Sequence, residues 1–370
     1  MDIELNVFDL NFNRLGEISV YKELEIERNY TKISTLILRV VTSKGMIELL
    51  QHDNILTTRE NPNYGYIIQN FFYTDENETE IEIHAYSLNY MLSWRSIVTQ
   101  QYYSGNVEGV VKSFINSNFI NPSNPNRIVP NLRLAHNNNI QLSIVSTAFG
   151  ITVDEHVFAI CNENDISIDI VMNHVDKKFD VVTWQGEDRS TLQTANPHVI
   201  FSKEFDNIIN QQYTSSKTDF KTTAYVVGEE WYEEGRLTVA INDEQSGFNR
   251  RELFIDSSLG SEFTDEEGFS VLLSDEEYIE VLKKEGAETL VNYQVIETFE
   301  SEVDMYSQFT YGVDYGLGDK VSVRNDEIGK VLHTRVISAT LTSNREGTNL
   351  SINFGSSIPT LYEKIKKKVK

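Results

Sequence analysis

Apolar residues take every second position in several short segments near the start of the chain. These segments lie at residues 3–7, 24–26, 36–40 and 81–85, and clusters of Gly, Pro, Asn and Asp separate them. Alternation marks strands with one buried face, and a run of short strands with turns between them is typical of a small barrel or sandwich. Residues 1–98 are therefore predicted to form a β-barrel-like domain.

The end of the chain shows the same alternation in longer strands. A strand-like run at residues 331–341 lies between two reversals, at 325–329 and 343–347, which are rich in Gly, Asn and Asp. Turns of this composition connect neighbouring antiparallel strands. The pattern predicts a compact meander over residues 311–361, which closes a second β-barrel-like domain at residues 186–358.

The middle of the chain changes to helical spacing. Over residues 107–115, apolar side chains follow the i, i+3, i+4, i+7, i+8 rule of an amphipathic helix. The prolines within residues 121–126 end this helix, because proline cannot continue one. Strands are expected at 166–172 and 180–184, so residues 99–185 are predicted to form a mixed α/β domain.

A second helix is expected close to the C-terminal meander. Ser274 and Glu277 have the Ser-x-x-Glu spacing of a capping box, and Gly286 is predicted to stop the helix. This helix belongs to an insertion, about residues 228–304, in the second β domain. The predicted fold class is α+β, mostly β, with two small β-barrel-like domains, an intervening α/β domain and a helix-bearing insertion.

Charge is distributed unevenly over the 370 residues. The formal net charge of −24 argues against specific nucleic-acid binding, because phosphate recognition needs a basic surface. Residues 228–304 hold 22 Asp and Glu against five Lys and Arg, a net charge of −17, whereas the tail at 359–370 holds five lysines. Two interpretations stay open: a solvated face with a frayed tail, or contact with oppositely charged neighbours in an assembly.

The composition also bears on the cellular setting and on cysteine chemistry. The chain has no run of eighteen apolar residues, so no membrane span is expected, and its start lacks the features of a secretory signal. The single cysteine, Cys161, allows no intrachain disulfide. We interpret Cys161 as a buried small hydrophobe, since a nucleophilic role would need His156 or His174 close to it in space.

No catalytic, cofactor-binding or metal-binding residue is predicted, because the sequence contains no motif for a nucleotide-binding loop, a zinc protease or a serine hydrolase. Asn162, Asn164, Asp165 and Asp169 resemble calcium ligands. The glycine and the glutamate spacing of a calcium-binding loop are missing, however.

Two further segments have competing interpretations. The acids at 265–267 and 275–277 could supply a carboxylate pair for glycoside hydrolysis, but acids also stabilise the positive end of a helix. In the turn at 184–190, Asp188 or Ser190 is expected to cap the adjoining backbone while Arg189 pairs locally. A ligand-binding turn is the alternative there.

Several segments resemble, in their order and spacing, siphovirus and prophage tail proteins related to the baseplate hub. The resemblance covers nearly the whole chain and rests on no single specific motif. The segments that carry it are Phe8–Gly16, Ser87–Arg95, Phe179–Ser190, Ile200–Asn207, Tyr315–Val323, Leu350–Gly355 and Ile358–Leu361.

The resemblance implies a structural hub subunit at the distal end of a phage or phage-derived tail. In that family, two barrel-like domains from each of three subunits are expected to form a pseudo-sixfold ring. The implied partners are two further copies of the chain, the distal tail and tube proteins, the tape-measure protein and a spike or fibre. Assembly is expected in the host cytoplasm, and the final location is the baseplate of the virion tail.

The resemblance implies that the chain is not an enzyme and needs no cofactor. Longer relatives carry a wall hydrolase or a host-binding extension after the closing barrel, whereas this sequence reaches Lys370 shortly after it. Two alternatives to the hub stay open: a cell-wall-degrading tail protein and a tail protein that binds glycans of the host surface.

Overall fold

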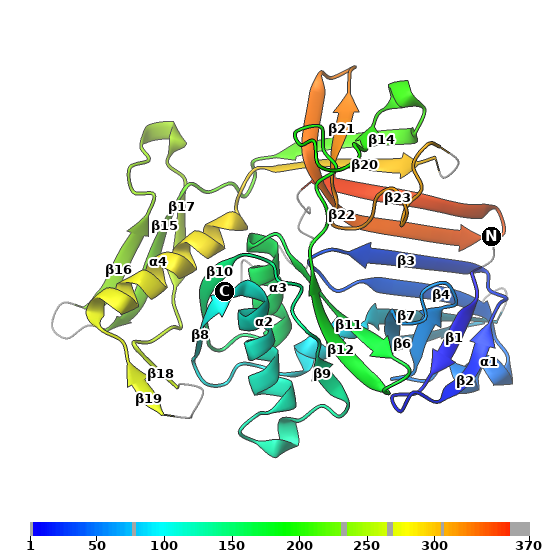
Figure 1. Cartoon of the computed structure of the whole chain (residues 1–370), viewed down its shortest axis with the longest axis horizontal. Coiled ribbons are helices and arrows are strands. Elements are labelled where there is room, and N and C mark those ends of the chain that lie inside the picture. Colours follow the sequence, from blue (N-terminus) through cyan, green and yellow to red (C-terminus); the bar gives the residue numbers. More distant parts are fainter. Residues whose placement is uncertain (1–2, 76–78, 231–234, 265–268, 305–306, 356–370) are drawn as a thin grey trace.

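The computed structural model describes residues 3–75, 79–230, 235–264, 269–304 and 307–355 (Figure 1). Strands hold 45% of the described residues and helices hold 19%. The predicted α+β class with mostly β structure is therefore confirmed.

One 13-stranded sheet forms a large part of the described fold and contains strands from both ends of the chain. These strands are drawn in blue and in orange to red in Figure 1, side by side in one sheet. In spatial order, the main path of the sheet consists of β14 (Ile208–Ser216), β20 (Ile296–Val303), β23 (Gly347–Gly355), β22 (Lys330–Asn344), β3 (Glu23–Asn29), β4 (Thr35–Val41), β7 (Glu80–Ser87), β6 (Gly65–Thr74), β5 (Ile55–Thr58), β1 (Leu5–Phe8) and β2 (Arg14–Ile18). Off this path, β21 (Lys320–Asn325) pairs with β22, and β13 (Ile200–Phe201) pairs with β21.

The two halves of the sheet meet where β22 pairs with β3. Ser338–Asn344 of β22 lies antiparallel to Glu23–Asn29 of β3, with Leu341 opposite Ile26. The earlier part of the same strand, Lys330–Arg335, pairs with β21. Because β22 is 15 residues long, it can take part in both the C-terminal meander and the N-terminal sheet.

This pairing joins the two regions predicted as β-barrel-like domains into one sheet, and the bounds of the two domains stay a prediction. The described strand order runs from β14 to β2 without closing on itself, and no closed barrel is found in the part of the chain that the structure describes. Alternation identifies strands but not their partners, and the paired residues of β3 and β22 lie more than 300 positions apart. The sequence pattern therefore could not reveal the junction.

Buried side chains reinforce the junction between the two halves. Leu24 and Ile26 of β3 lie in a hydrophobic core formed by the N-terminal strands. Tyr30, just after β3, lies in a second hydrophobic core, which contains Phe201 and is formed mainly by the C-terminal strands. Leu341 of β22 packs against both cores. Since apolar burial is the main stabilising term in folding, the junction depends on side chains as well as on backbone hydrogen bonds.

The middle of the chain contributes two helices and two small sheets. Helix α2 (Val107–Ile115) spans the predicted residues, and helix α3 (Val153–Glu163) was not predicted. One sheet has the order β11 (Ser167–Asn173), β12 (Lys178–Trp184) and β9 (Leu132–Leu134), and β11 and β12 confirm two predicted strands. The other sheet has the order β10 (Ser143–Ala148), β8 (Gln101–Asn106), β18 (Glu262–Thr264) and β19 (Ser270–Leu272).

Shorter helical segments connect these elements. They are α1 (Lys44–Leu49), a π-helical turn at Asn116–Ile120, and 3₁₀ turns at Leu88–Trp94, Pro125–Arg127, Lys203–Phe205 and Gly247–Asn249. Within the described ranges, no helix is both long and apolar enough to cross a lipid bilayer.

The acidic insertion forms a small sheet covered by one helix. The sheet has the order β16 (Arg236–Ile241), β15 (Thr223–Glu230) and β17 (Glu252–Asp256), and helix α4 (Asp275–Val291) packs against it. In Figure 1 this unit lies on the opposite side of the molecule from the large sheet, with α2 and α3 between them. Strand β18 also pairs with β8, so the insertion is anchored to the middle of the chain.

Helix α4 begins as predicted but ends later. The Ser274–Glu277 capping box is present, whereas Gly286 lies inside the helix, which continues to Val291. A Cβ atom at Gly286 would lie 2.6 Å from a side-chain carbon of Ile241 and 2.7 Å from one of Val226. The prediction of a stop is wrong, because this glycine lets the helix pack closely against the sheet.

We expect Gly286→Ala to lower the free energy of unfolding by about 1 kcal/mol. Alanine gains about 1 kcal/mol in helix propensity, but overpacking a tight contact costs about 1–3 kcal/mol. The matched control is Gly109→Ala in α2, where a Cβ would meet nothing within 4 Å, and it should stabilise the protein. Urea unfolding of both variants measures the difference, and equal stabilisation by both would contradict the close packing of α4.

Candidate functional site

Cys161 lies fully buried in α3, which confirms its interpretation as a buried small side chain. Burial raises the pKa of its thiol and so disfavours the nucleophilic thiolate. Nε2 of His156 forms a hydrogen bond of 3.0 Å with the Ser146 hydroxyl, and burial lowers the pKa of this imidazole to about 4. The other candidate partner, His174, packs against the ring of Phe8 instead.

The carboxylates that resemble calcium ligands lie in two different polar networks. Asp165 forms an ion pair with Lys320 at 2.9 Å and another with Arg335. Asp169 accepts a hydrogen bond of 2.9 Å from Nε1 of Trp184. Among the described residues, no three His, Cys, Asp or Glu side chains gather in a way that could hold a metal ion.

The acidic segments considered for glycoside hydrolysis divide into two parts. Residues 265–267 lie outside the described residues. At the start of α4, a side-chain oxygen of Glu277 accepts a hydrogen bond of 2.8 Å from the backbone N–H of Ser274. Glu277 therefore caps its own helix, as the dipole interpretation predicts.

The turn after β12 is built as a structural turn. Oδ1 of Asp188 accepts a hydrogen bond of 2.9 Å from the backbone N–H of Ser190. Arg189 pairs locally with Glu187 at 2.8 Å, and it also pairs with Asp319 at 3.0 Å. The second ion pair ties this turn to the loop that precedes β21.

Asp169 lies where the N-terminal, middle and C-terminal parts of the fold meet, and it is 7% exposed. Besides the bond from Trp184, its Oδ1 accepts hydrogen bonds of 3.3 Å from the Asn89 amide and the Tyr64 hydroxyl. Burial raises the pKa of this carboxyl group, and the Arg28 cation, 3.6 Å away, opposes that effect. A buried carboxylate with this many donors fixes the positions of all of them.

Arg28 brings β3 into this cluster. Its guanidinium carbon lies 4.0 Å from the centroid of the Tyr64 ring, which is a favourable cation–π geometry. Its Nε atom is buried and has no hydrogen-bond partner. We name Arg28, Tyr64, Asn89, Asp169 and Trp184 the Asp169 cluster.

A cavity of about 470 Å³ borders the Asp169 cluster. Its wall includes Arg28, Asp169, Trp184 and the loop residues Tyr311 and Leu317. This hollow is largely open to solvent, and its wall combines aromatic side chains with a few polar groups, as the walls of ligand sites do. The sequence pattern places Trp184 at a turn, and nothing in the sequence indicates that this residue meets Arg28 or Tyr311.

A second network links the same regions from the side of β22. Arg335 pairs with Asp165, donates to the backbone oxygen of Gly318, and lies with its guanidinium carbon 5.0 Å from the Tyr30 ring centroid. The Tyr30 hydroxyl donates to the backbone oxygen of Asp165 at 3.0 Å. The loop after α3 is therefore fixed to residues of both sheet halves.

The insertion meets α3 through acidic side chains. Lys284 and Glu288 of α4 pair at 3.4 Å, and both interact electrostatically with Glu163 of α3. Burial and the charge of Glu288 raise the pKa of Glu163 to about 8, and burial also raises the pKa of Glu285 and of Glu288. Burial at the contact between α3 and α4 therefore favours the neutral form of these carboxyl groups.

Two of these residues left a signal in the sequence that the pattern analysis did not use. Arg28 follows Leu24 and Ile26 at a spacing of two, so it occupies an inward-facing position of the strand. Asp169 is the charged residue of the strand Ser167–Asn173 and lies between Ile168 and Ile170. A charged residue at a core position of a strand indicates a buried partner, although it does not identify that partner.

We expect Asp169→Asn to lower the free energy of unfolding by about 2–3 kcal/mol. Loss of one partner from a buried ion pair leaves a buried charge uncompensated, although the Arg28 side chain is 27% exposed, which reduces the cost. The control is Asp326→Asn, which removes a surface pair with Arg324 and should cost about 0–1 kcal/mol. Urea unfolding measures both, and equal effects would show that the Asp169 cluster does not hold the regions together.

We expect Glu163→Gln to stabilise the protein at pH 8.5 by about 1–2 kcal/mol and to have little effect at pH 4.5. The folded-state pKa of Glu163 lies above its ordinary value, so the wild-type protein loses stability as pH rises from about 4.5 through 8. Glutamine cannot ionise and avoids this loss. Urea unfolding at the two pH values tests this, with the exposed Glu48→Gln of α1 as a control without a pH-dependent gain.

Comparison with solved structures places the fold among phage tail proteins. A tail protein from Neisseria meningitidis MC58 aligns with a TM-score of 0.58 at 14% identity, over 96% of this chain and 97% of the other. The 43 kDa tail protein of prophage MuSo2 from Shewanella oneidensis aligns with a TM-score of 0.56 at 11% identity, over 95% and 98%. Prophage tail protein gp18 from Listeria monocytogenes EGD-e aligns with a TM-score of 0.53 at 10% identity, over 99% and 98%. At these identities the likeness shows the fold alone.

Comparison with protein families gives a match over almost the whole described chain. No curated protein matches the sequence. The model of the Siphovirus ReqiPepy6 Gp37-like protein family matches residues 4–356. The chain therefore belongs to the Siphovirus ReqiPepy6 Gp37-like family, and the predicted resemblance to siphovirus and prophage tail proteins is confirmed.

Proposed function

We propose that this phage tail protein is a structural subunit of the baseplate hub. Three copies form a ring at the distal end of the tail, and the ring joins the tail tube to a central spike or fibre. Family membership over residues 4–356 and the tail-protein fold support this proposal.

The observation that carries the proposal is the single sheet shared by the two β regions. The junction of β22 with β3 holds the N-terminal half, within residues 1–98, at a fixed angle to the C-terminal half, within residues 186–358. Two β units held together in one chain are what a threefold assembly needs to present six similar faces to a sixfold tube. We assign the ring-forming, barrel-like role to these two halves.

The outer strands of the sheet supply surfaces for neighbours. The strand order ends at β14 and at β2, and an edge strand presents backbone groups that a neighbouring chain can pair with. In the ring, these edges would meet other copies or the distal tail and tube proteins. The tape-measure protein and the spike or fibre would contact the two ends of the ring, after assembly in the host cytoplasm.

One observation favours a second candidate function, binding of host-surface glycans. The cavity at the Asp169 cluster has Trp184 and Tyr311 in its wall beside charged side chains. Aromatic and polar groups together suit sugar rings, which have apolar faces and hydroxyl edges. This function would place the chain at the tail tip without requiring a ring.

Light scattering and electron microscopy test the hub. We expect the purified chain, alone or in tails from the strain that encodes it, to be present as a trimer. The expected mass is three times the 42.5 kDa of one chain, with ring-shaped particles in negative stain. A tag in the exposed turn after Asn325 should label the distal tip of the tail with threefold occupancy.

Other results would contradict this function. A chain that remains monomeric in solution and is absent from the tail tip would exclude a hub. Saturable binding of host-wall glycan that quenches Trp184 fluorescence in such a monomer would favour the glycan-binding candidate. Loss of turbidity from purified cell walls would instead favour an enzyme.

A further inference from the structure

The sheet of the insertion has one covered face and one open face. Val226, Val239 and Ile255 point toward α4, where they pack with Tyr278 and Leu282. Successive side chains of a strand point to opposite faces, so their neighbours form the open side. We name this side the outer face and define it by Tyr225, Val227, Thr238, Glu252, Phe254 and Asp256.

An aromatic side chain lies at the centre of the outer face. Phe254 is 69% exposed, although it stands in a regular strand and lies opposite Tyr225 of β15. Glu252 and Asp256 flank it on the same face, and their side chains are 52% and 62% exposed. Asp256 pairs with Arg236 and Glu252 pairs with Arg250, so the exposed ring lies between two carboxylates that each have a cationic partner and remain more than half exposed.

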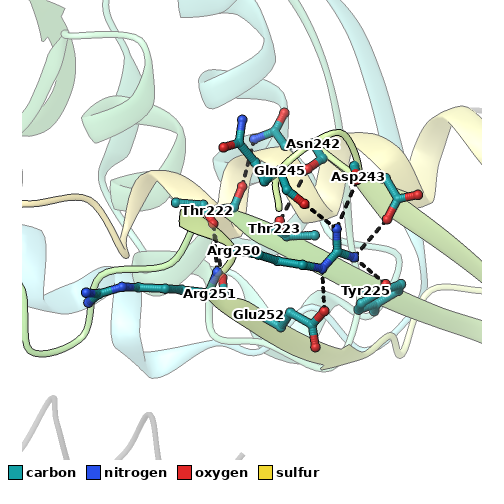
Figure 2. A network of polar contacts seen from close by, with 9 residues as sticks. All are labelled: Thr222, Thr223, Tyr225, Asn242, Asp243, Gln245, Arg250, Arg251 and Glu252. Carbon is teal, nitrogen blue, oxygen red and sulfur yellow. Dashed lines mark hydrogen bonds and ion pairs between the residues drawn. The ribbon is translucent and has the colours of Figure 1, made fainter. Parts of the chain in front are cut away.

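A polar network fixes one border of this face (Figure 2). Arg250 bonds to Glu252 at 2.6 Å and to Asp243 at 2.8 Å, and it also donates to the Tyr225 hydroxyl. Arg250 Nη1 further donates to the backbone oxygen of Gln245 at 2.9 Å. The loop before β17 is thus held in place, so the outer face is preformed and needs no ordering when a partner binds.

The C-terminal tail has the complementary chemistry. Residues 356–370 contain five lysines and one glutamate, a net charge of +4, against −17 for residues 228–304. Leu361, Ile365 and Val369 recur at a spacing of four, so the tail also carries regularly placed apolar side chains. A segment with a strong net negative charge and an exposed aromatic ring on its surface suits a basic segment with apolar side chains.

The tail also starts at the base of the insertion. Gly355 pairs with Thr298 in β20, a strand that begins at Ile296, soon after the end of α4. Tyr293 lies between α4 and β20, and its backbone oxygen accepts a hydrogen bond from the backbone N–H of Lys221. Lys221 comes just before β15, which pairs with β17, the strand that contains Phe254. The path through these contacts from Gly355 to Phe254 is at most about 45 Å, and 15 extended residues span about 50 Å.

We propose that residues 356–370 dock on the outer face of the insertion in the same chain. Apolar tail side chains contact Phe254, while the lysines pair with Glu252 and Asp256. Docking covers the exposed ring and offsets part of the negative charge of the insertion. This inference does not depend on the hub assignment, because it concerns a contact within one chain.

Zero-length carbodiimide cross-linking of the full chain tests the proposal. The reagent joins lysine amines to carboxylates in direct contact, and mass spectrometry identifies the joined residues. We expect links from the tail lysines to Glu252 or Asp256. Phe254→Ser should reduce their yield about fivefold or more, as should about 0.5 M NaCl, since salt screens charge pairing between exposed groups. The matched control is Phe72→Ser, which removes another exposed aromatic ring, from β6. Phe72 is 51% exposed, and its replacement should leave the cross-linking yield unchanged.

An equal mixture of ¹⁴N- and ¹⁵N-labelled protein separates contacts within a chain from contacts between chains. Links that stay within one isotope support the proposal. Links that join the two isotopes would show that the tail binds a second copy, which overturns docking within one chain. Absence of links to Glu252 and Asp256, or equal yields in Phe254→Ser and wild type, would overturn the outer face as the docking site.

Discussion

The antiparallel pairing of β22 with β3 is the constraint on which the rest of the structure depends. It joins segments from the two ends of the chain into one sheet, and Leu341 packs into the cores of both halves. Without it, the N-terminal strands and the C-terminal meander would be two β units connected only through the middle of the chain. With it, the segment between β3 and β22 is closed into a loop whose ends are fixed. The contacts at the junction must offset the chain entropy that is lost when this loop closes.

Buried charges then set how the middle region is oriented against this frame. The Asp169 cluster and the Arg335–Asp165 pair each connect the middle region to residues near β3 or β22. Such groups contribute little net stability compared with apolar side chains of the same size, but they favour one arrangement over others. A subunit whose role is to present faces at fixed angles benefits from that specificity. The insertion meets the middle region where α3 faces α4, and burial raises the pKa of Glu163 and of Glu288 there.

The local elements could be predicted from the sequence, because their signals are local. The spacing at Val107–Ile115, the Ser274–Glu277 capping box and the strands around residues 166–184 all match the structure. Helix α3 was not predicted, although Val153, Val157, Ile160 and Cys161 have helical spacing, because its apolar stripe is weaker than that of α2. Gly286 was misread because its role depends on Val226 and Ile241, which lie far away in sequence. The sheet junction and the Asp169 cluster could not be predicted, since both require knowing which distant segments meet.

Native-state hydrogen exchange at the junction tests the central claim most directly, namely that the two β halves form one rigid frame. If they do, the backbone amides of β3 and of Ser338–Asn344 in β22 exchange with one shared opening free energy, equal to that of global unfolding. If the N-terminal strands open independently, with a lower free energy than the C-terminal meander, the halves are separate units and the account is wrong.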